Sequence, residues 1–359
     1  MRATDCGRKD NVCLLDLSSG QIERFLSSMD VPAFRGRQIE NWIYQGLVYD
    51  FEQMTNLPVA LRHGLAEAAE ILPFAVRAEM QSTDGETRKV LLELHDGSAI
   101  EAVFMSYDPT TSTKGRSTVC VSTQAGCAVG CSFCATGRGG FVRNLSAGEI
   151  VGQVLYFAAQ GGRITNVVFM GQGEPLRNFD AVWKAIEILN SSGGLGIAAR
   201  HLTVSTAGIV PGIRRLSSKT LQVGLALSLH APNDDLRNTL VPLNRKYPIR
   251  DLLSACWDYT AKTGRRVTFE YVLIRGVNDG ALQARELGAL LSGHLAHINL
   301  IPVNPVDDLA LQPPTRQGVA SFQAELHRKG ITSTLRIERG QDILAACGQL
   351  MLKRSVAAG

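Results

Sequence analysis

No stretch of this 359-residue sequence is both long enough and apolar enough to span a membrane, so we expect no membrane partner. The first 17 residues carry charged side chains and no apolar block, which excludes a secretory signal there. Hydrophobic residues make up 45% of the chain and charged residues only 19%, a composition that excludes wholesale disorder and a coiled-coil rod. The sequence therefore predicts a globular protein with a cytoplasmic location.

The 8 cysteines need an explanation other than disulfides, because the cytoplasm keeps thiols reduced. The charge distribution is also uneven. The net charge is only +4, yet residues 200–266 contain 11 lysines and arginines against 4 aspartates and glutamates. Such a basic segment suggests a polyanion as partner, although solvated side chains on a folded surface would give the same count.

The periodicity of the sequence divides the chain into four segments. Residues 1–80 have helical spacing and predict a small N-terminal helical domain. Residues 81–112 predict a β-hairpin, with Asp96 and Gly97 at its turn, followed by a linker. Residues 113–350 form the main domain, and residues 351–359 form a C-terminal tail.

The main domain alternates strand-like and helix-like segments. Short apolar segments typical of buried strands lie at 118–122, 166–170, 202–205, 223–229, 267–273, 298–303 and 334–337. Amphipathic segments between them include 147–160, 180–190, 251–262 and 281–291. Repeated βα units imply a parallel sheet covered by helices, and six or seven units fall short of a closed barrel of eight. The predicted fold class is therefore α/β, a partial (β/α) barrel, with its chemistry at the C-terminal ends of the strands.

Three cysteines lie close together on a glycine-containing loop after the first of these strands: Cys127, Cys131 and Cys134. A structural zinc site needs a closed set of four ligands, and the nearest histidine downstream is His201. A [4Fe–4S] cluster held by only three cysteines keeps one iron open to bind a ligand. The alternative is that the three thiols simply pack in the core, which their close spacing beside glycines disfavours.

The spacing Cys-x3-Cys-x2-Cys resembles the pattern of the radical S-adenosylmethionine (radical SAM) superfamily, and residues 170–175 resemble its Gly-Glu-Pro element. Five further segments are similar to the RlmN and Cfr group of radical SAM RNA adenine methyltransferases: 118–127, 141–145, 228–234, 302–305 and 339–350. This similarity extends from about residue 30 to residue 350. It implies a partial (β/α)6 radical SAM barrel, one [4Fe–4S] cluster on the three cysteines, and an N-terminal helical domain that contacts RNA.

The resemblance also implies a reaction that uses two S-adenosylmethionine molecules per turnover. The first methylates Cys347, and the second yields the radical that lets the Cys347 methyl group add to an adenine carbon. Attack by Cys120 on the Cys347 sulfur then releases the base and leaves a disulfide to be reduced. Taken alone, Cys120 and Cys347 would be small core side chains. The family's proposed base for the adenine proton corresponds to Glu101, with Cys120 as the competing base and a surface carboxylate as the alternative for Glu101.

The S-adenosylmethionine site implied by the resemblance draws on the ends of several strands. Gly173 and Glu174 would bind its amino group, and Ser205 its ribose or carboxylate. The remaining predicted contacts are Ser228, Leu229, His230 and Asn304, which also follow strands. Taken alone, His230 would be a structural imidazole. The other cysteines, Cys6, Cys13 and Cys256, match no motif.

The implied substrate is one adenosine of 23S rRNA, methylated at C2, and also the adenosine after the anticodon of some tRNAs. Lys and Arg residues would meet RNA phosphates: Arg35, Arg37, Arg214, Arg215, Arg245, Lys246, Arg265 and Arg266. An electron donor such as flavodoxin or ferredoxin is a further expected partner. The alternatives are Cfr-type methylation at C8, a zinc-stapled RNA-binding protein without turnover, and a radical enzyme with a small-molecule substrate, which Cys120 and Cys347 together disfavour.

The Cys347→Ala variant should lose methylation completely while keeping the absorbance of the cluster, because the thiol that would carry the methyl group is removed and the cluster ligands remain. Cys120→Ala should instead trap a covalent adduct between protein and RNA. Gel electrophoresis of the adduct and methyl incorporation into RNA measure the two outcomes. Turnover by Cys347→Ala would contradict the role of this residue.

Overall fold

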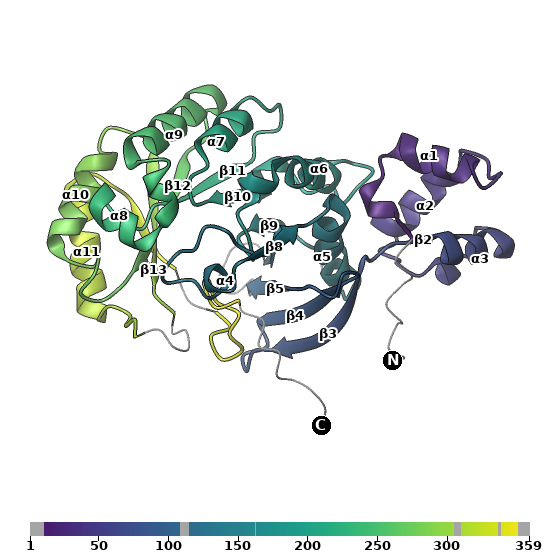
Figure 1. The fold of residues 1–359 in the computed structure, drawn as a ribbon, viewed down its shortest axis with the longest axis horizontal. Helices are drawn as coiled ribbons and strands as arrows, with labels where there is room; N and C mark the ends of the chain where they lie inside the picture. Colours follow the sequence, from purple (N-terminus) through teal and green to yellow (C-terminus); the bar gives the residue numbers. More distant parts are fainter. Residues whose placement is uncertain (1–10, 108–114, 162, 305–309, 337–338, 351–359) are drawn as a thin grey trace.

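The computed structural model describes residues 11–107, 115–161, 163–304, 310–336 and 339–350. Its centre is a ten-stranded sheet in the order β14-β13-β12-β11-β10-β9-β6-β5-β4-β3 (Figure 1). Cys6, the tail 351–359 and part of the predicted linker lie outside the described residues. No helix among the residues described is long and apolar enough to cross a membrane.

Seven strands of the sheet are parallel and form the predicted partial barrel. They are β6 (Arg116–Cys120), β9 (Asn166–Phe169), β10 (Leu202–Thr206), β11 (Gly224–Ser228), β12 (Val267–Leu273), β13 (Ala296–Pro302) and β14 (Ser333–Leu335). Six of these strands are each followed by a helix that returns the chain to the next strand, and β14 is a short edge strand. The α/β class and the partial (β/α)6 barrel are therefore confirmed.

The helices of the barrel bury apolar faces against the sheet. They are α5 (Ala147–Ala159), α6 (Phe179–Asn190), α7 (Val210–Ser217), α8 (Asp234–Leu240), α9 (Ile249–Thr263), α10 (Ala281–Leu291) and α11 (Arg316–Arg328). Helix α5 begins with a capping box, in which Ser146 Oγ accepts a hydrogen bond from the backbone N–H of Glu149 and the Glu149 carboxylate accepts one from the N–H of Ser146. Nearly all of α5 is buried, because α6 and the N-terminal segment around Leu14–Asp16 also pack against it.

The predicted β-hairpin is present and forms part of the barrel sheet. Strands β4 (Thr87–Leu94) and β5 (Ala99–Tyr107) form it, and β5 pairs antiparallel with β6 so that Val103 lies opposite Cys120. Strand β3 (Phe74–Gln81) adds to the other side of the hairpin. An unpaired edge of β6 would expose backbone hydrogen-bonding groups, and the hairpin satisfies them. The predicted boundaries between the domains stay predictions.

The N-terminal helices lie at one end of the molecule in Figure 1, far from α10 and α11. They are α1 (Ser19–Ser27), α2 (Arg35–Tyr44) and α3 (Val59–Ala68), with the two short strands β1 (Val12–Cys13) and β2 (Ala69–Glu70) paired beside them. Short 3-10 helices complete the chain: η1 (Leu14–Asp16), η2 (Phe51–Gln53), η3 (Pro175–Asn178), η4 (Ala199–His201) and η5 (Pro242–Arg245).

Gly148 marks a close contact between the N-terminal helices and the barrel. Its backbone N–H donates to Asp16 Oδ1 at 2.7 Å in the first turn of α5. A Cβ atom at this position would lie 2.7 Å from Cys13 Sγ and 2.9 Å from Asp16 Oδ2. Only glycine therefore allows η1 to approach α5 this closely.

Gly148→Ala should lower the free energy of unfolding by about 1–3 kcal/mol, because the added methyl group overpacks this contact. Gly20→Ala is the matched control: Gly20 lies in the first turn of α1 and a Cβ there would meet nothing within 4 Å. Denaturant unfolding measures both changes. Equal stability of the two variants would contradict the close docking of η1 on α5.

Candidate active site

The three clustered cysteines lie on a loop that leaves from and returns to a small antiparallel ribbon. The ribbon consists of β7 (Gln124–Gly126) and β8 (Phe141–Asn144), and the loop between them also contains the short helix α4 (Ala135–Arg138). The N–H of Cys127 donates to Gly140 O at 2.7 Å and closes the loop at its base. Gly126 has φ +73°, and a Cβ there would lie 2.1 Å from Gly140 O, so this closure requires glycine.

The thiols of Cys127, Cys131 and Cys134 all line one cleft. Burial raises the pKa of the Cys127 thiol to about 11 and that of Cys131 well above its ordinary value, and the neighbouring thiols raise both further. Thiolates at these positions therefore need a nearby positive charge, which bound iron supplies. The donor set fits a [4Fe–4S] cluster with three protein ligands. No group of three or more His, Cys, Asp or Glu side chains among the described residues is arranged around a single ion, and in a [4Fe–4S] cluster each thiol binds a different iron.

Glu174 follows β9 and joins three parts of the site. Its carboxylate accepts hydrogen bonds from Leu176 N at 3.0 Å, Thr206 Oγ1 at 2.8 Å and Ala207 N at 2.7 Å. Its own N–H donates to Gln124 Oε1 in the ribbon at 2.8 Å. Burial raises the pKa of Glu174, and these hydrogen bonds oppose the shift. The Glu174 carboxylate is thus already bound by the protein. A ligand at residues 170–175 would therefore meet the backbone of this segment and not the Glu174 side chain.

Most of the predicted S-adenosylmethionine residues line the same cleft as the cysteines, which encloses about 940 Å³ including space open to solvent. They are Gly173, Glu174, Ser205, Ser228, His230 and Asn304. Leu229 is different: its side chain is fully buried in the main hydrophobic core, while its carbonyl accepts from Arg237 Nε. The ends of five parallel strands thus meet the cysteine loop at one cleft, as expected for a barrel of this kind.

Cys347 lies where this cleft adjoins a second one. The second cleft is lined by Cys347 and Cys120 together with apolar residues of β5. Cys347 is held in place by its carbonyl, which accepts from Asn304 Nδ2 at 3.0 Å, and by Gly348, whose carbonyl accepts from Ala135 N at 2.8 Å. Burial raises the pKa of the Cys120 thiol to about 12, and both cysteines are free thiols in the structure. The structure therefore brings Cys120 and Cys347 to one cleft beside the cysteine loop.

Glu101 is buried in β5, with an exposed fraction of 4%, so it is not a surface carboxylate. Its Oε1 lies 3.0 Å from Lys89 Nζ, which also donates to Leu344 O at 3.1 Å. Glu101 is not among the residues that line either of the two clefts. Its role as the base stays a prediction.

His230 is buried at the end of β11 with φ +61°, a left-handed conformation that histidine adopts more readily than most residues. Its Nδ1 accepts from Val272 N at 3.1 Å, which places the ring proton on Nε2. Burial, and then the charge of Arg237, lower the pKa of His230 to about 3. The imidazole is therefore neutral and keeps one N–H donor for the cleft it lines.

Sequence reasoning missed three residues of the site. Arg237 is fully buried in α8 and donates to the carbonyls of Ala207, Ser228 and Leu229, so it ties the ends of β10 and β11 together. Glu270 and Arg336 both line the first cleft. Burial raises the pKa of Glu270 and the charge of Arg336 opposes this shift, while Cys347 and then Glu270 raise the pKa of Arg336. No motif marks these residues, and an arginine in an amphipathic helix is normally solvated.

The basic residues predicted to meet RNA are not all at the cleft. Arg245 and Lys246 are exposed at η5, whose Leu243 packs with the apolar residues beside the cysteine loop. Arg215 pairs with Asp180 on the outside of the barrel. Arg265 and Arg266 immediately precede β12, which places them at the opposite edge of the sheet from the cleft.

Comparisons with known proteins agree with this geometry. Residues 121–286 match the model of the radical SAM superfamily, and residues 12–71 match that of the ribosomal RNA large subunit methyltransferase N-terminal domain. A radical SAM methyltransferase from Sphaerobacter thermophilus has a solved structure with TM-score 0.90 and 50% sequence identity, covering 94% of this chain and 99% of that one.

The fold, the three-cysteine loop and these matches define a radical SAM enzyme. Two curated relatives carry the name "Probable dual-specificity RNA methyltransferase RlmN". The one from Pelotomaculum thermopropionicum is 48% identical, covering 97% of this chain and 93% of its own, and the one from Roseiflexus castenholzii is 45% identical, covering 94% and 95%. The chain belongs to the RlmN family.

The stability of the protein should depend on pH through His230. Its folded pKa of about 3 lies below the ordinary value of 6.5, so below pH 6.5 only the unfolded chain takes up this proton. The stabilising contribution is complete above pH 6.5 and is lost progressively as the pH falls toward 3.

His230→Asn removes this proton but keeps a residue that tolerates positive φ. Between pH 7.5 and pH 5, the wild type should lose about 2 kcal/mol more stability than the variant. Denaturant unfolding at several pH values gives both curves, which should run parallel above pH 7.5. Curves that stay parallel down to pH 5 would show that the folded imidazole takes up the proton.

Proposed function

We propose that this chain is a radical SAM RNA methyltransferase that methylates C2 of one adenosine in 23S rRNA and the adenosine after the anticodon in tRNAs. One observation carries the proposal: Cys347 lies between the cleft of the cysteine loop and a cleft that contains a second thiol, Cys120. An RNA-binding protein without turnover, or a protein whose cluster only transfers electrons, would not require the two thiols Cys120 and Cys347. The family membership supports the RNA substrate.

Each site residue has a role in this reaction. Cys127, Cys131 and Cys134 would hold the [4Fe–4S] cluster, which supplies the electron that cleaves S-adenosylmethionine. The cleft residues Gly173, Glu174, Ser205, Ser228, His230 and Asn304 would position that molecule. Leu229 would act only indirectly, because its N–H and carbonyl are bonded to Glu270 and Arg237. Buried side chains fixed by hydrogen bonds, such as Glu174 and His230, keep water out and leave little freedom for the bound molecule.

The two remaining thiols would handle the methyl group. The Cys347 thiolate would take a methyl group from a first S-adenosylmethionine, and the radical formed from a second would remove one hydrogen atom from that methyl group, so that the remaining CH2 radical can add to the base. Addition would leave a radical on the base, which would lose its C2 proton to Glu101 or Cys120 and return one electron to the cluster, so that a CH2 group joins the base to the Cys347 sulfur. The Cys120 thiolate, after giving up any proton it has taken, would then attack the Cys347 sulfur, and the released carbon would take up a proton to become the methyl group. This leaves a Cys120–Cys347 disulfide, which an external reductant returns to two thiols. A flavodoxin or ferredoxin would supply electrons to the cluster, and the protein would act in the cytoplasm.

The alternatives have less support. The relatives are named RlmN and the N-terminal domain matches the methyltransferase model for large-subunit rRNA, which favours C2 over the Cfr-type reaction at C8. The zinc-stapled binding protein lacks a closed set of ligands among the described residues. A radical enzyme with a small-molecule substrate would not need an N-terminal domain of the kind found in ribosomal RNA methyltransferases.

The test is mass spectrometry of 23S rRNA and tRNA fragments from a strain without this protein and from the same strain complemented with it. The deletion should remove one C2-methyladenosine from the rRNA and the one after the tRNA anticodon, and complementation should restore both. Complementation with Cys347→Ala is the matched control and should restore neither. Restoration of an 8-methyladenosine, or of no methyl group at all, would contradict the proposal.

A further inference from the structure

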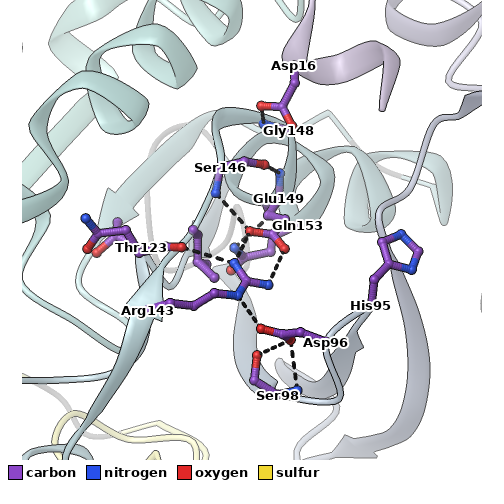
Figure 2. A network of polar contacts seen from close by, with 12 residues as sticks. Asp16, His95, Asp96, Ser98, Thr123, Arg143, Ser146, Gly148, Glu149 and Gln153 are labelled. Atoms are coloured by element: carbon purple, nitrogen blue, oxygen red, sulfur yellow. Dashed lines mark hydrogen bonds and ion pairs between the residues drawn. The ribbon is translucent and has the colours of Figure 1, made fainter. Parts of the chain in front are cut away.

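Arg143 in β8 pairs with two carboxylates at once, those of Glu149 and Asp96 (Figure 2). Its two terminal nitrogens donate to the two carboxylate oxygens of Glu149, at 2.8 and 2.7 Å. Its Nε donates to Asp96 Oδ2 at 2.5 Å, and Nη1 also donates to Asn144 O at 3.0 Å. One guanidinium therefore joins the ribbon to two carboxylates on two other elements.

Both carboxylates are themselves fixed. Glu149 lies in the first turn of α5, with a side chain that is 8% exposed and also accepts from Ser146 N at 2.8 Å. Asp96 lies in the turn between β4 and β5 and accepts from Ser98 N at 3.0 Å. The hydrogen bond from Arg143 holds the pKa of Asp96 well below its usual range, so this carboxylate is ionised throughout the neutral range. Hydrogen bonds from the backbone thus hold both carboxylates in place where Arg143 meets them.

The ribbon in which Arg143 lies is connected to the cysteine loop and to Glu174. Both ends of the cysteine loop leave from it, and its closure depends on the hydrogen bond between Cys127 N and Gly140 O. On the opposite strand, Gln124 bonds through its amide nitrogen to Asn144 Oδ1 at 2.8 Å and through its oxygen to Glu174 N at 2.8 Å. A rotation of the ribbon would therefore displace the cysteines and Glu174 together.

We propose that Arg143 is the positioning residue of the cysteine loop: its simultaneous pairing with Glu149 and Asp96 holds the ribbon in the orientation that lets three thiols bind one cluster. This inference rests on the proposed cluster site. A planar guanidinium can bind one carboxylate through two nitrogens and a second carboxylate through its third, whereas the ammonium group of lysine cannot fix both directions.

The test is the rate of iron release from anaerobically purified, cluster-loaded protein in the presence of a ferrous chelator. Arg143→Gln should release iron about 10- to 100-fold faster than the wild type, the range typical for loss of a group that orients metal ligands. Arg143→Lys should lie between the two. Asp96→Asn, which leaves the α5 cap intact, should also speed iron release. Combining it with Arg143→Gln should add little, because both substitutions remove the same Arg143–Asp96 ion pair.

Arg77→Gln is the matched control. Arg77 in β3 pairs with Glu93 in β4 through two nitrogens, at 3.0 and 2.5 Å, and neither residue is part of the ribbon. It should release iron at the wild-type rate, and circular dichroism should show all variants folded. If Arg143→Gln does not fold, Asp96→Asn alone decides the question.

The outcomes separate this inference from the proposed function. Wild-type release rates in folded Arg143→Gln or Asp96→Asn, full restoration by Arg143→Lys, or equally fast release by Arg77→Gln would overturn the role of Arg143 while leaving the cluster site intact. Wild-type protein that holds no iron after reconstitution would instead overturn the proposed function itself. Amide hydrogen exchange provides a second measurement, because Arg143→Gln should expose the N–H of Cys127 to faster exchange.

Discussion

Parallel pairing from β6 to β13 is the constraint on which the whole site depends. It places the C-terminal ends of six strands at one edge of the sheet, so that residues far apart in the sequence meet there. Glu174 then reaches the end of β10, and Asn304 reaches the carbonyl of Cys347. Without that register, the cysteine loop, the cleft and the two thiols would be unrelated features of the chain.

Buried polar groups stabilise the cleft at the C-terminal ends of the strands. A cleft of this size among apolar strands would collapse unless side chains with fixed hydrogen bonds lined it. Arg237 binds three carbonyls at the ends of β10 and β11, Glu174 binds three donors, and His230 is fixed through Nδ1. Each is costly to bury alone. The protein satisfies Arg237 and Glu174 before any ligand arrives, whereas His230 keeps its Nε2–H for the cleft.

Periodicity predicted the strands and the barrel well, because it is a local property of the chain, whereas the residues expected at the cleft came from the family resemblance. The predicted segment 267–273 is β12 residue for residue, and 281–291 is α10. The pairing of β5 with β6 makes the predicted hairpin part of the barrel sheet, and it is a long-range contact that no local pattern reveals. Leu229 was placed among ligand contacts although its side chain packs in the core, and the importance of Arg143 and Arg237 emerged only with their partners.

The central claim is that three cysteines hold a cluster whose remaining iron is free to bind S-adenosylmethionine. Mössbauer spectroscopy of protein reconstituted with isotopically enriched iron, before and after addition of S-adenosylmethionine, tests it most directly. The account predicts that one iron site shifts on addition while the others keep their parameters. Irons that all respond alike, or a spectrum that does not change at all, would contradict it.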